Sequence, residues 1–252
     1  ISLGLVGSEM CIRDRINITT SPQTVVEGLA TSQVYTVSLS TASSQSITVQ
    51  YATSNGTATS GSDYTSTTGT LTFNAGITTQ TITIPILNNS VSEADETFDL
   101  TLSNPTNALL GSTKSVMTTI TDTLTASVTT TLSANVENLT LTGTAAIDGT
   151  GNAGANIIKG NDASNILKGG NGIDVLTGMG GNDIFDLTGI KLAANRNTIT
   201  DFLTGDTVRL SNNLTTRTGT GTPIFANVIQ ASTVSLNVSA ADVFVFNFDN
   251  TE

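Results

Sequence analysis

Four nine-residue repeats run without a gap from Gly151 to Asp186, and no other stretch restricts the fold of this chain as strongly. Each repeat opens on Gly, with a small residue at position four, Asn or Asp at position six and an apolar side chain at position eight. The position-eight residues are Ile158, Leu167, Leu176 and Phe185. A short fixed period with one apolar column is typical of a parallel β-helix or β-roll, because that column can point inward from short strands.

The position-six residues are the candidate ligands of this stretch: Asn156, Asn165, Asp174 and Asp183. Small residues at positions one and four allow tight turns with positive φ, so the position-six oxygen lies beside outward-facing backbone carbonyls. Such oxygens are hard ligands that suit calcium. The predicted metal-binding turns include the glycines of the last two repeats, which are Gly169, Gly172, Gly178 and Gly181.

The repeats resemble the haemolysin-type calcium-binding repeat of repeats-in-toxin proteins, most clearly in Gly169–Thr177 (GGNGIDVLT). This resemblance implies that two nonapeptides make one coil and that calcium lies between coils stacked on the same side. Asn156 would then face Asp174, and Asn165 would face Asp183. Each site would have one carboxylate where the full pattern has two, so the number and affinity of the sites stay open. The structural alternative is a flexible Gly/Asn-rich loop.

The composition is acidic, with 252 residues, a formal net charge of −11, a pI near 4.1 and no His. The length predicts one or two domains. A basic patch for nucleic acid is absent. The acidic charge suits a secreted protein that meets millimolar calcium, although it could also serve solubility alone. No apolar run is long enough to predict a membrane-spanning segment. Without His, the Ser-His-Asp, Cys-His and HExxH arrangements are excluded, and we predict no enzyme activity.

The first fifteen residues, Ile1–Arg15, differ from everything that follows and contain the single Cys11. They resemble a translated adaptor or vector sequence, and we leave them out of the fold prediction. The rest of the chain has no cysteine, so no disulfide framework is expected. Because the chain stops abruptly at Glu252, we expect it to be a fragment of a longer protein.

From Ile16 to about Asp122, short runs alternate apolar and polar residues between Gly, Asn and Ser breaks. Period two with Thr and Val enrichment predicts an antiparallel β-sandwich over 16–124, and so an all-β chain. Because only 4% of residues are aromatic, the core must rely on Ile, Leu and Val. The predicted inward-facing residues are Tyr35, Val37, Leu39, Ile47, Val49, Tyr51, Leu71, Phe73, Ile82, Ile84, Ile86, Phe98, Leu100, Leu102, Val116 and Ile120.

Six segments of this region occur in a specific order: VVEG (25–28), GTATSGSDY (56–64), GTLTFNAG (69–76), TITIPILNN (81–89), EADETFDLTLSNP (93–105) and TITD (119–122). Together they resemble a Calx-beta domain. The resemblance implies a seven-stranded immunoglobulin-like sandwich that binds calcium through acidic residues at one end. The matching acidic positions are Glu27, Asp63, Glu93, Glu96 and Asp122.

Each of these five acidic residues lies at the end of a predicted strand or in a loop, so a sandwich could gather them at one end. Clustered carboxylates repel one another unless a cation neutralises them, which favours a hard metal such as calcium. Asn88 and Asn89 stand where calcium-responsive members of the family carry paired Asp, and fewer charges mean weaker binding. The alternatives are that Glu93 and Glu96 merely solubilise a loop and that Asp63 caps a turn.

The remaining chain is expected to hold a linker at 125–135, the roll with its amino-terminal cap at 136–188 and a further β region at 189–252. Val136, Leu139 and Leu141 would form the cap that an open coil needs. Asn197–Leu210 resembles the segment that follows the last coil in secreted repeat-containing proteins. There, Asp201 and Asp206 either supply further calcium oxygens or form turns. A last apolar strand near Phe244 and Phe246 lacks an evident partner.

These features predict a calcium-binding structural and adhesive segment of a larger secreted or cell-surface bacterial protein. The coils would fold or rigidify on extracellular calcium, and the partners would be calcium ions and cell-surface or matrix components. The alternative is the noncatalytic secretion tail of an exoenzyme, a protease or lipase, whose catalytic domain lies elsewhere. Glycan binding by the sandwich has little support, because the chain has no Trp and only three Tyr.

Overall fold

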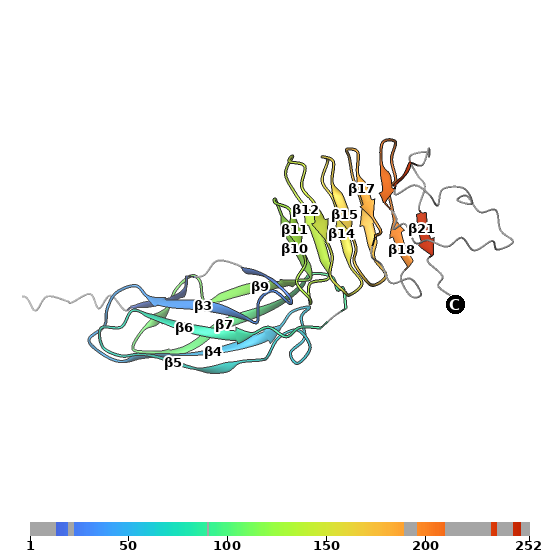
Figure 1. Ribbon diagram of the computed structural model, residues 1–252. Helices are drawn as coiled ribbons and strands as arrows, with labels where there is room; N and C mark the ends of the chain where they lie inside the picture. Colours follow the sequence, from blue (N-terminus) through green and yellow to red (C-terminus); the bar gives the residue numbers. More distant parts are fainter. Residues whose placement is uncertain are drawn as a thin grey trace, which may run out of the picture. The chain divides into compact units, whose positions relative to one another are not determined.

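The computed structural model describes residues 14–19, 23–89, 91–188, 196–209, 233–235 and 244–247 (Figure 1). All named regular elements in these residues are β-strands, which confirms the all-β prediction. The chain divides into two compact units. The sandwich unit comprises Ile1–Val25, Ala30–Leu87 and Asp95–Ile120, and the roll unit comprises Val26–Leu29, Asn88–Ala94 and Thr121–Glu252. Two short segments from the first half of the chain therefore belong to the roll unit.

The sandwich has two sheets, as expected for an immunoglobulin-like domain. One sheet has the strand order β6-β3-β1-β8 and the other β2-β9-β7-β4-β5. The strands are β1 (Arg15–Ile18), β2 (Gln23–Val26), β3 (Ser32–Leu39), β4 (Ile47–Asn55), β5 (Thr68–Phe73), β6 (Thr79–Pro85), β7 (Glu96–Thr106), β8 (Leu109–Leu110) and β9 (Ser115–Thr121). The ladders β1–β3, β3–β6, β4–β5, β4–β7 and β7–β9 are antiparallel, whereas β1 and β8 are parallel, with Arg15 paired to Leu109. Arg15 is thus part of the fold, although the sequence placed it in the leader.

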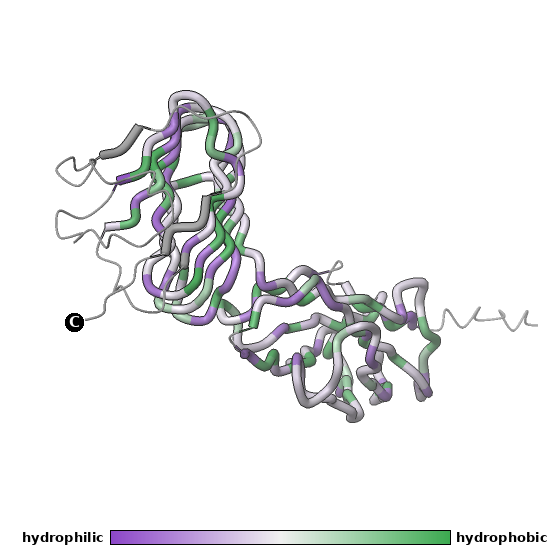
Figure 2. The backbone as a smooth tube through the Cα atoms, turned by 90° about the vertical axis from the view of Figure 1, so that its right-hand side faces the viewer, coloured by the Kyte–Doolittle hydropathy of each residue, from purple (hydrophilic) through white to green (hydrophobic). Residues whose placement is uncertain are grey.

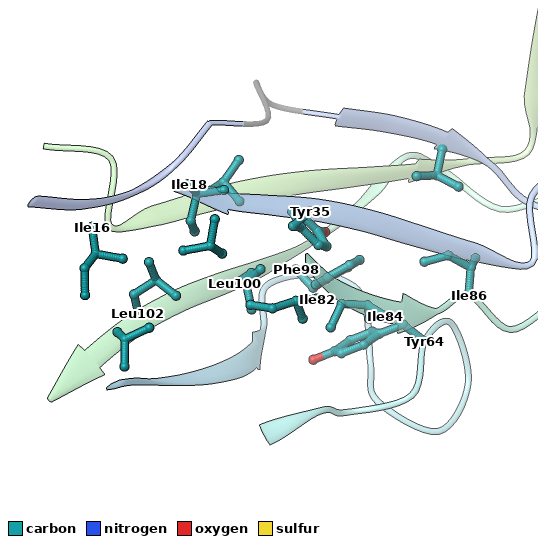
Figure 3. Packing of buried hydrophobic residues seen from close by; sticks show 14 of the residues in the cluster. Ile16, Ile18, Tyr35, Tyr64, Ile82, Ile84, Ile86, Phe98, Leu100 and Leu102 are labelled. Carbon is teal, nitrogen blue, oxygen red and sulfur yellow. The ribbon is translucent and has the colours of Figure 1, made fainter. Parts of the chain in front are cut away.

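The sandwich core forms because alternate residues of each strand point to one face (Figure 3). On β3, for example, Tyr35 and Val37 are fully buried. The rings of Tyr64 and Phe98 stack with centroids 4.3 Å apart, and the Tyr35 hydroxyl forms a hydrogen bond with Thr118. The predicted inward face is confirmed apart from Tyr51 and Leu71, which pack against the core while remaining partly exposed.

Two parallel sheets make up the roll. The first contains β10 (Thr123–Ala126), β12 (Asn138–Leu141), β14 (Ile157–Lys159), β16 (Val175–Thr177) and β18 (Arg196–Ile199). The second contains β11 (Thr130–Thr131), β13 (Gly149–Thr150), β15 (Ile166–Lys168), β17 (Ile184–Asp186) and β19 (Thr207–Arg209). We call the successive pairs β10/β11 to β18/β19 coils 1 to 5. The first two nonapeptides form coil 3 and the last two form coil 4, so two nonapeptides make one coil.

The roll core is the apolar column predicted from position eight. Ile158, Leu167, Leu176 and Phe185 are all fully buried. The column continues beyond the repeats through Leu139 in coil 2 and Val208 in coil 5. In Figure 2 the hydrophobic residues of the roll recur from one coil to the next. Very short strands are stable in this roll because each coil adds its apolar side chains to a continuous core.

The roll is longer at both ends than the repeats alone predicted. β10 and β11, parts of which lie in the expected linker 125–135, pair in parallel with coil 2. The expected cap, with Leu139 and Leu141, is an interior coil. β18 and β19 form coil 5 in register with coil 4. The last apolar strand has a partner after all, because β21 (Phe244–Asn247) pairs with β18 and β20 (Thr233–Ser235) with β19.

Irregular spacing explains why the sequence hid these coils. Corresponding residues of coils 3 and 4 are 18 positions apart, but those of coils 2 and 3 at Glu137 and Asn156 are 19 apart. Those of coils 4 and 5 at Asp174 and Asn197 are 23 apart. A fixed nine-residue period detects only the coils that keep it. Of the expected last apolar strand, only the part around Phe244 and Phe246 lies within the described residues.

Candidate metal centre

Polar side chains at the start of the strands stack into two buried columns along the roll. We define the first polar column as Asp122, Glu137, Asn156, Asp174 and Asn197, which precede or begin the strands of the first sheet in register. The second polar column is Asn165, Asp183 and Asp206, with Ile147 at the matching place in coil 2. The structure therefore places Asn156 beside Asp174 and Asn165 beside Asp183, as the repeat resemblance implies.

Hydrogen bonds run along both columns and connect one coil to the next. The backbone N–H of Asn156 donates to Asp174 Oδ1 at 3.0 Å, and that of Asn165 donates to Asp183 Oδ1 at 2.8 Å. In the same way Asp174 N–H donates to Asn197 Oδ1, and Asp183 N–H donates to Asp206 Oδ1. The second carboxylate oxygens behave differently. Asp174 Oδ2 and Asp183 Oδ2 are buried and have no hydrogen-bond partner among the described residues.

The electrostatics of the two aspartates follow from this burial. Asp174 is 0% exposed and Asp183 is 1% exposed. Desolvation raises the pKa of Asp174 to about 6, against the opposing effects of the Asn156 backbone amide and of the Asn197 side chain in coil 5. Desolvation also raises the pKa of Asp183 to about 7, opposed by the Asn165 amide and reinforced by the charges of Asp206 and Asp201. A cation would remove this cost, so the residues of coil 4 fit a hard metal ion.

The glycines of coil 4 make room for these carboxylates. A Cβ at Gly169 would lie 2.1 Å from Asp174 Oδ2, and a Cβ at Gly178 would lie 2.3 Å from Asp183 Oδ2. Both distances are far below van der Waals contact, so any side chain at position one would displace the carboxylate. At position four, Gly172 and Gly181 have φ of 111° and 107°, values that L-residues with a side chain rarely adopt. The four glycines predicted for the site are therefore required by the turns themselves.

Asp201 and Asp206 close the end of the second polar column. Asp201 accepts hydrogen bonds from the N–H groups of Gly178 and Met179, both at 2.7 Å. Asp206 accepts one from Leu203 N–H at 2.8 Å, in addition to that from Asp183. Both residues form turns, which was one of the two predicted alternatives. They also place negative charge beside Asp183, and Asp206 occupies the same place in coil 5 as Asp183 in coil 4.

Three of the five acidic residues predicted for the sandwich end lie in the roll unit, namely Glu27, Glu93 and Asp122. Asn89 connects two of them: its N–H donates to Glu27 Oε1 at 2.6 Å, and its Nδ2 donates to Glu93 Oε2 at 2.8 Å. The N–H of Glu93 donates to Asp122 Oδ2. Amide groups of Asn89 and Glu93 thus already donate to these carboxylates, so these residues fit a metal ion less well than those of coil 4.

Glu137 is the acidic residue that the sequence prediction missed. It is 5% exposed, and desolvation raises its pKa to about 7, with further increases from Asp122, Glu27 and Glu93 and an opposing effect of its own backbone amide. The sequence did contain a signal for it. Buried Leu139 follows Glu137 by two places, as position eight follows position six in each nonapeptide.

The other two predicted ligands, Asp63 and Glu96, lie in the sandwich unit. Asp63 Oδ2 accepts the Thr59 N–H at 2.6 Å, so its carboxylate caps a turn. Glu96 is the first residue of β7. In the part of the chain that the structure describes, no group of three or more Asp, Glu, His or Cys side chains is arranged to hold a metal ion. The same residues contain no helix that is long and apolar enough to cross a membrane.

Comparison with known proteins identifies the first half of the chain. Residues 12–124 match the family model of the Calx-beta domain. This region is a Calx-beta domain. Calx-beta domains bind calcium and are not catalytic, which is consistent with the predicted lack of enzyme activity. The family match ends at residue 124, so it does not extend to the nonapeptides.

Among solved structures, the Calx-beta region is similar to the apo form of the Calx CBD1 domain. That match has 27% identity and a TM-score of 0.42, and it covers 43% of this chain and 96% of that one. The calcium binding domain CBD12 of CALX1.1 matches with 25% identity and a TM-score of 0.41 over 49% of this chain. The matched part spans 54% of that second structure. No curated protein matches the chain.

Proposed function

We propose that this chain is a calcium-binding structural segment of a larger secreted or cell-surface bacterial protein, and that it becomes rigid when it meets extracellular calcium. One observation carries the proposal: coil 4 buries two carboxylate oxygens, Asp174 Oδ2 and Asp183 Oδ2, that have no hydrogen-bond partner among the described residues. A buried, unpaired carboxylate oxygen is costly, and proteins normally satisfy it with a donor or a cation.

The residues that would hold the ions are Asp174 in the first polar column and Asp183 in the second. Calcium when bound would supply two positive charges and accept several oxygen ligands from one turn. Asp174 and Asp183 each keep one oxygen on a backbone N–H of coil 3, which fixes the direction of the other. Gly169 and Gly178 leave the second oxygen open to the backbone of its own turn.

We also propose a second, weaker calcium site at Glu27, Glu93, Asp122 and Glu137, whose side chains are not gathered into a ligand cluster in the described structure and would have to draw together around the ion. It is supported by the Calx-beta match and by the mutual repulsion of these carboxylates at Glu137. Asn88 and Asn89 lower the negative charge of this site, and Asn89 already donates to two of its carboxylates. Fewer acidic ligands give lower affinity, so we expect this site to fill only at higher calcium concentrations than those of coil 4.

The stabilisation from calcium depends on its concentration. Extracellular calcium modules bind with dissociation constants of about 0.1–1 mM. At about 1 mM calcium, a site with a dissociation constant of about 0.1 mM stabilises the folded roll by about 1.4 kcal/mol. Two such sites in one coil would shift the folded fraction of a marginal roll substantially. This supports a role as a spacer or adhesive module that is stiff outside the cell, where its partners would be cell-surface or matrix components.

The proposal can be tested by unfolding the full chain in urea with far-UV circular dichroism, in chelator and in increasing calcium. We expect calcium to raise the unfolding midpoint of the roll transition, whereas magnesium should raise it much less because it requires near-octahedral coordination. The variant with both Asp174→Asn and Asp183→Asn should lose most of this response. A wild-type midpoint that is the same in chelator and in calcium would refute the proposal.

A further inference from the structure

Coils 3 and 4 occupy successive places in the roll but differ in side-chain chemistry at positions two and six. Their turns differ as well, because positions two and four have positive φ in coil 4 and not in coil 3. In the two nonapeptides of coil 3, both positions are Asn: Asn152 and Asn156 in one turn, and Asn161 and Asn165 in the other. In coil 4 the corresponding residues are Gly170 and Asp174, and Met179 and Asp183. Coil 3 therefore presents four side-chain N–H₂ groups where coil 4 presents none.

All four amides of coil 3 donate hydrogen bonds to backbone carbonyls that precede them in the roll. In the first turn, Asn152 Nδ2 lies 2.6 Å from Ser133 O and 2.9 Å from Val136 O, and Asn156 Nδ2 lies 3.1 Å from Glu137 O. In the second turn, Asn161 Nδ2 reaches three carbonyls, the nearest being Ala145 O at 2.9 Å, and Asn165 Nδ2 lies 2.6 Å from Ile147 O. Turn carbonyls of coils 1 and 2 are thus satisfied by neutral donors.

At positions two and six, coil 4 has no side-chain amide that could donate a hydrogen bond to the preceding coil. Among the described residues, no side-chain amide of coil 4 donates to a carbonyl of coil 3. Instead Asp174 and Asp183 each leave one oxygen buried and without a partner. A Cβ at Gly170 would lie 2.2 Å from the carbonyl oxygen of Asn152, and one at Gly172 would lie 2.1 Å from that of Gly154, so these carbonyls closely approach the coil 4 turn. Calcium takes several oxygen ligands, and both carbonyl and carboxylate oxygens are ligands that it accepts.

We propose that the side-chain amides of Asn152, Asn156, Asn161 and Asn165 take the place of cations in coil 3, so that coil 3 closes without calcium and, among the turns of the nonapeptides, only those of coil 4 bind a cation. The proposal rests on the proposed function for the identity of the coil 4 ligand. A tethered amide places partial positive charge against the carbonyls at any calcium concentration, whereas a dissociable ion does so only when it is present.

The roll is therefore divided into two parts with different calcium dependence. Coils 1 to 3 form a preassembled template, and the parallel ladder of coil 4 is added to it through the hydrogen bonds from Asn156 and Asn165 to Asp174 and Asp183. Repeat proteins unfold from such boundaries when neighbouring units differ in stability. Calcium removal should open the roll from coil 4 towards the carboxyl terminus and leave coil 3 folded.

Hydrogen exchange on the wild-type chain tests this division without any substitution. The backbone N–H groups of Gly151 and Ile157 are hydrogen-bonded within coils 2 and 3, to Lys168 O and Glu137 O, whereas those of Thr198 and Thr207 are bonded to the coil 4 carbonyls of Asp174 and Asp183. In chelator we expect the coil 3 amides to be protected at least about tenfold more than those at the coil 4 boundary, and calcium should remove the difference. Equal protection of both sets in chelator would overturn the proposal.

The reciprocal substitution is Asn165→Asp, which replaces the donor by a carboxylate oxygen. We expect it to lower the unfolding midpoint in chelator and to enlarge the calcium-dependent increase in that midpoint. Asn74→Asp is the matched control, because Asn74 is an exposed residue of the sandwich unit and the charge change is identical. Asn165→Asp and Asn74→Asp with equal calcium responses would overturn the proposal.

The two proposals can fail separately. If the wild type responds to calcium but Asn165→Asp responds no more than the control, coil 4 binds calcium and the proposal that amides replace cations in coil 3 is wrong. If the wild type does not respond and Asn165→Asp gains a response, the proposal that amides replace cations in coil 3 is supported and the proposed function of coil 4 is wrong. Should Asn165→Asp not fold even in calcium, the exchange pattern of the wild type decides.

Discussion

Replacing Asp183 by Asn should stabilise the calcium-free roll, which is the opposite of the usual effect of altering a buried residue. The Asp183 carboxylate is 1% exposed, and burial raises its pKa from 3.8 to about 7. At pH 8 the folded state must keep this group ionised, and the rise in pKa corresponds to about 4 kcal/mol of lost stability. The Asn side chain avoids that cost because it carries no charge.

The substitution also preserves the existing contact. Asn Oδ1 can still accept the Asn165 N–H, which Asp183 Oδ1 now accepts at 2.8 Å. Its Nδ2 can donate to coil 3 as Asn165 Nδ2 donates to Ile147 O in coil 2. Allowing for imperfect fit, we expect Asp183→Asn to increase the free energy of unfolding by about 2–4 kcal/mol in chelator at pH 8. In calcium the advantage should shrink, because the wild type gains about 1.4 kcal/mol per site at tenfold excess over its dissociation constant.

Urea unfolding followed by circular dichroism, in chelator and in calcium, measures both effects. Asp162→Asn is the control, because Asp162 is an exposed acidic residue of coil 3 and the change in charge is the same. It should alter stability by less than about 0.5 kcal/mol. The reasoning is refuted if Asp183→Asn is less stable than the wild type in chelator, or if it keeps the full calcium response.

Three further predictions concern pH, the turns and the sandwich. In chelator the roll should lose stability as pH rises from about 4 to 7. The reason is that Asp174 and Asp183 have folded-state pKa values of about 6 and 7, so the folded state binds more protons than the unfolded chain. A urea midpoint that increases over this pH range would contradict this prediction. Gly178→Ala should destabilise the roll by about 1–3 kcal/mol and weaken its calcium response, because the new Cβ would meet the Asp183 carboxylate. Gly154→Ala is the control, and it should change thermal stability little because its Cβ meets only a side-chain oxygen at 3.2 Å. Phe98→Ala should lower the free energy of unfolding of the sandwich by about 3–5 kcal/mol, measured in urea. It should leave the calcium dependence of hydrogen exchange in the roll unchanged. A loss of that dependence would show that the two units do not respond separately.

The sequence predicted those parts of the fold in which a simple period governs burial. Alternation on β3 and β7 identified the sandwich core, and the nine-residue period identified the inward column from Ile158 to Phe185. Tyr51 is a partial exception, because alternation gives the side of the sheet but not how far the opposite sheet covers it. Coils 1, 2 and 5 were hidden because turns of unequal length interrupt the period.

The sequence predicted where the candidate ligands lie on the coils better than it predicted their hydrogen bonds. The position-six residues and the turn glycines could be read from the repeat alone, since their spacing fixes the side of the coil on which they lie. The role of the Asn side chains could not be predicted from the sequence, because the amide oxygen can bind a metal ion while the amide nitrogen can replace one. Only the hydrogen bonds of Asn156 and Asn165 show that the nitrogen faces the preceding coil. Asp63 could likewise be a ligand or a turn cap, and Thr59 N–H shows the cap.

Counting bound calcium tests the central claim most directly. Isothermal titration of calcium into the full chain should be compared with the same titration of the variant carrying Asp174→Asn and Asp183→Asn. The account predicts that one bound ion is lost for each of the two aspartates replaced, while any binding at Glu27, Glu93, Asp122 and Glu137 persists. Equal stoichiometry in the wild type and the double variant would contradict it, because the two buried carboxylate oxygens of coil 4 would then have no ion to hold.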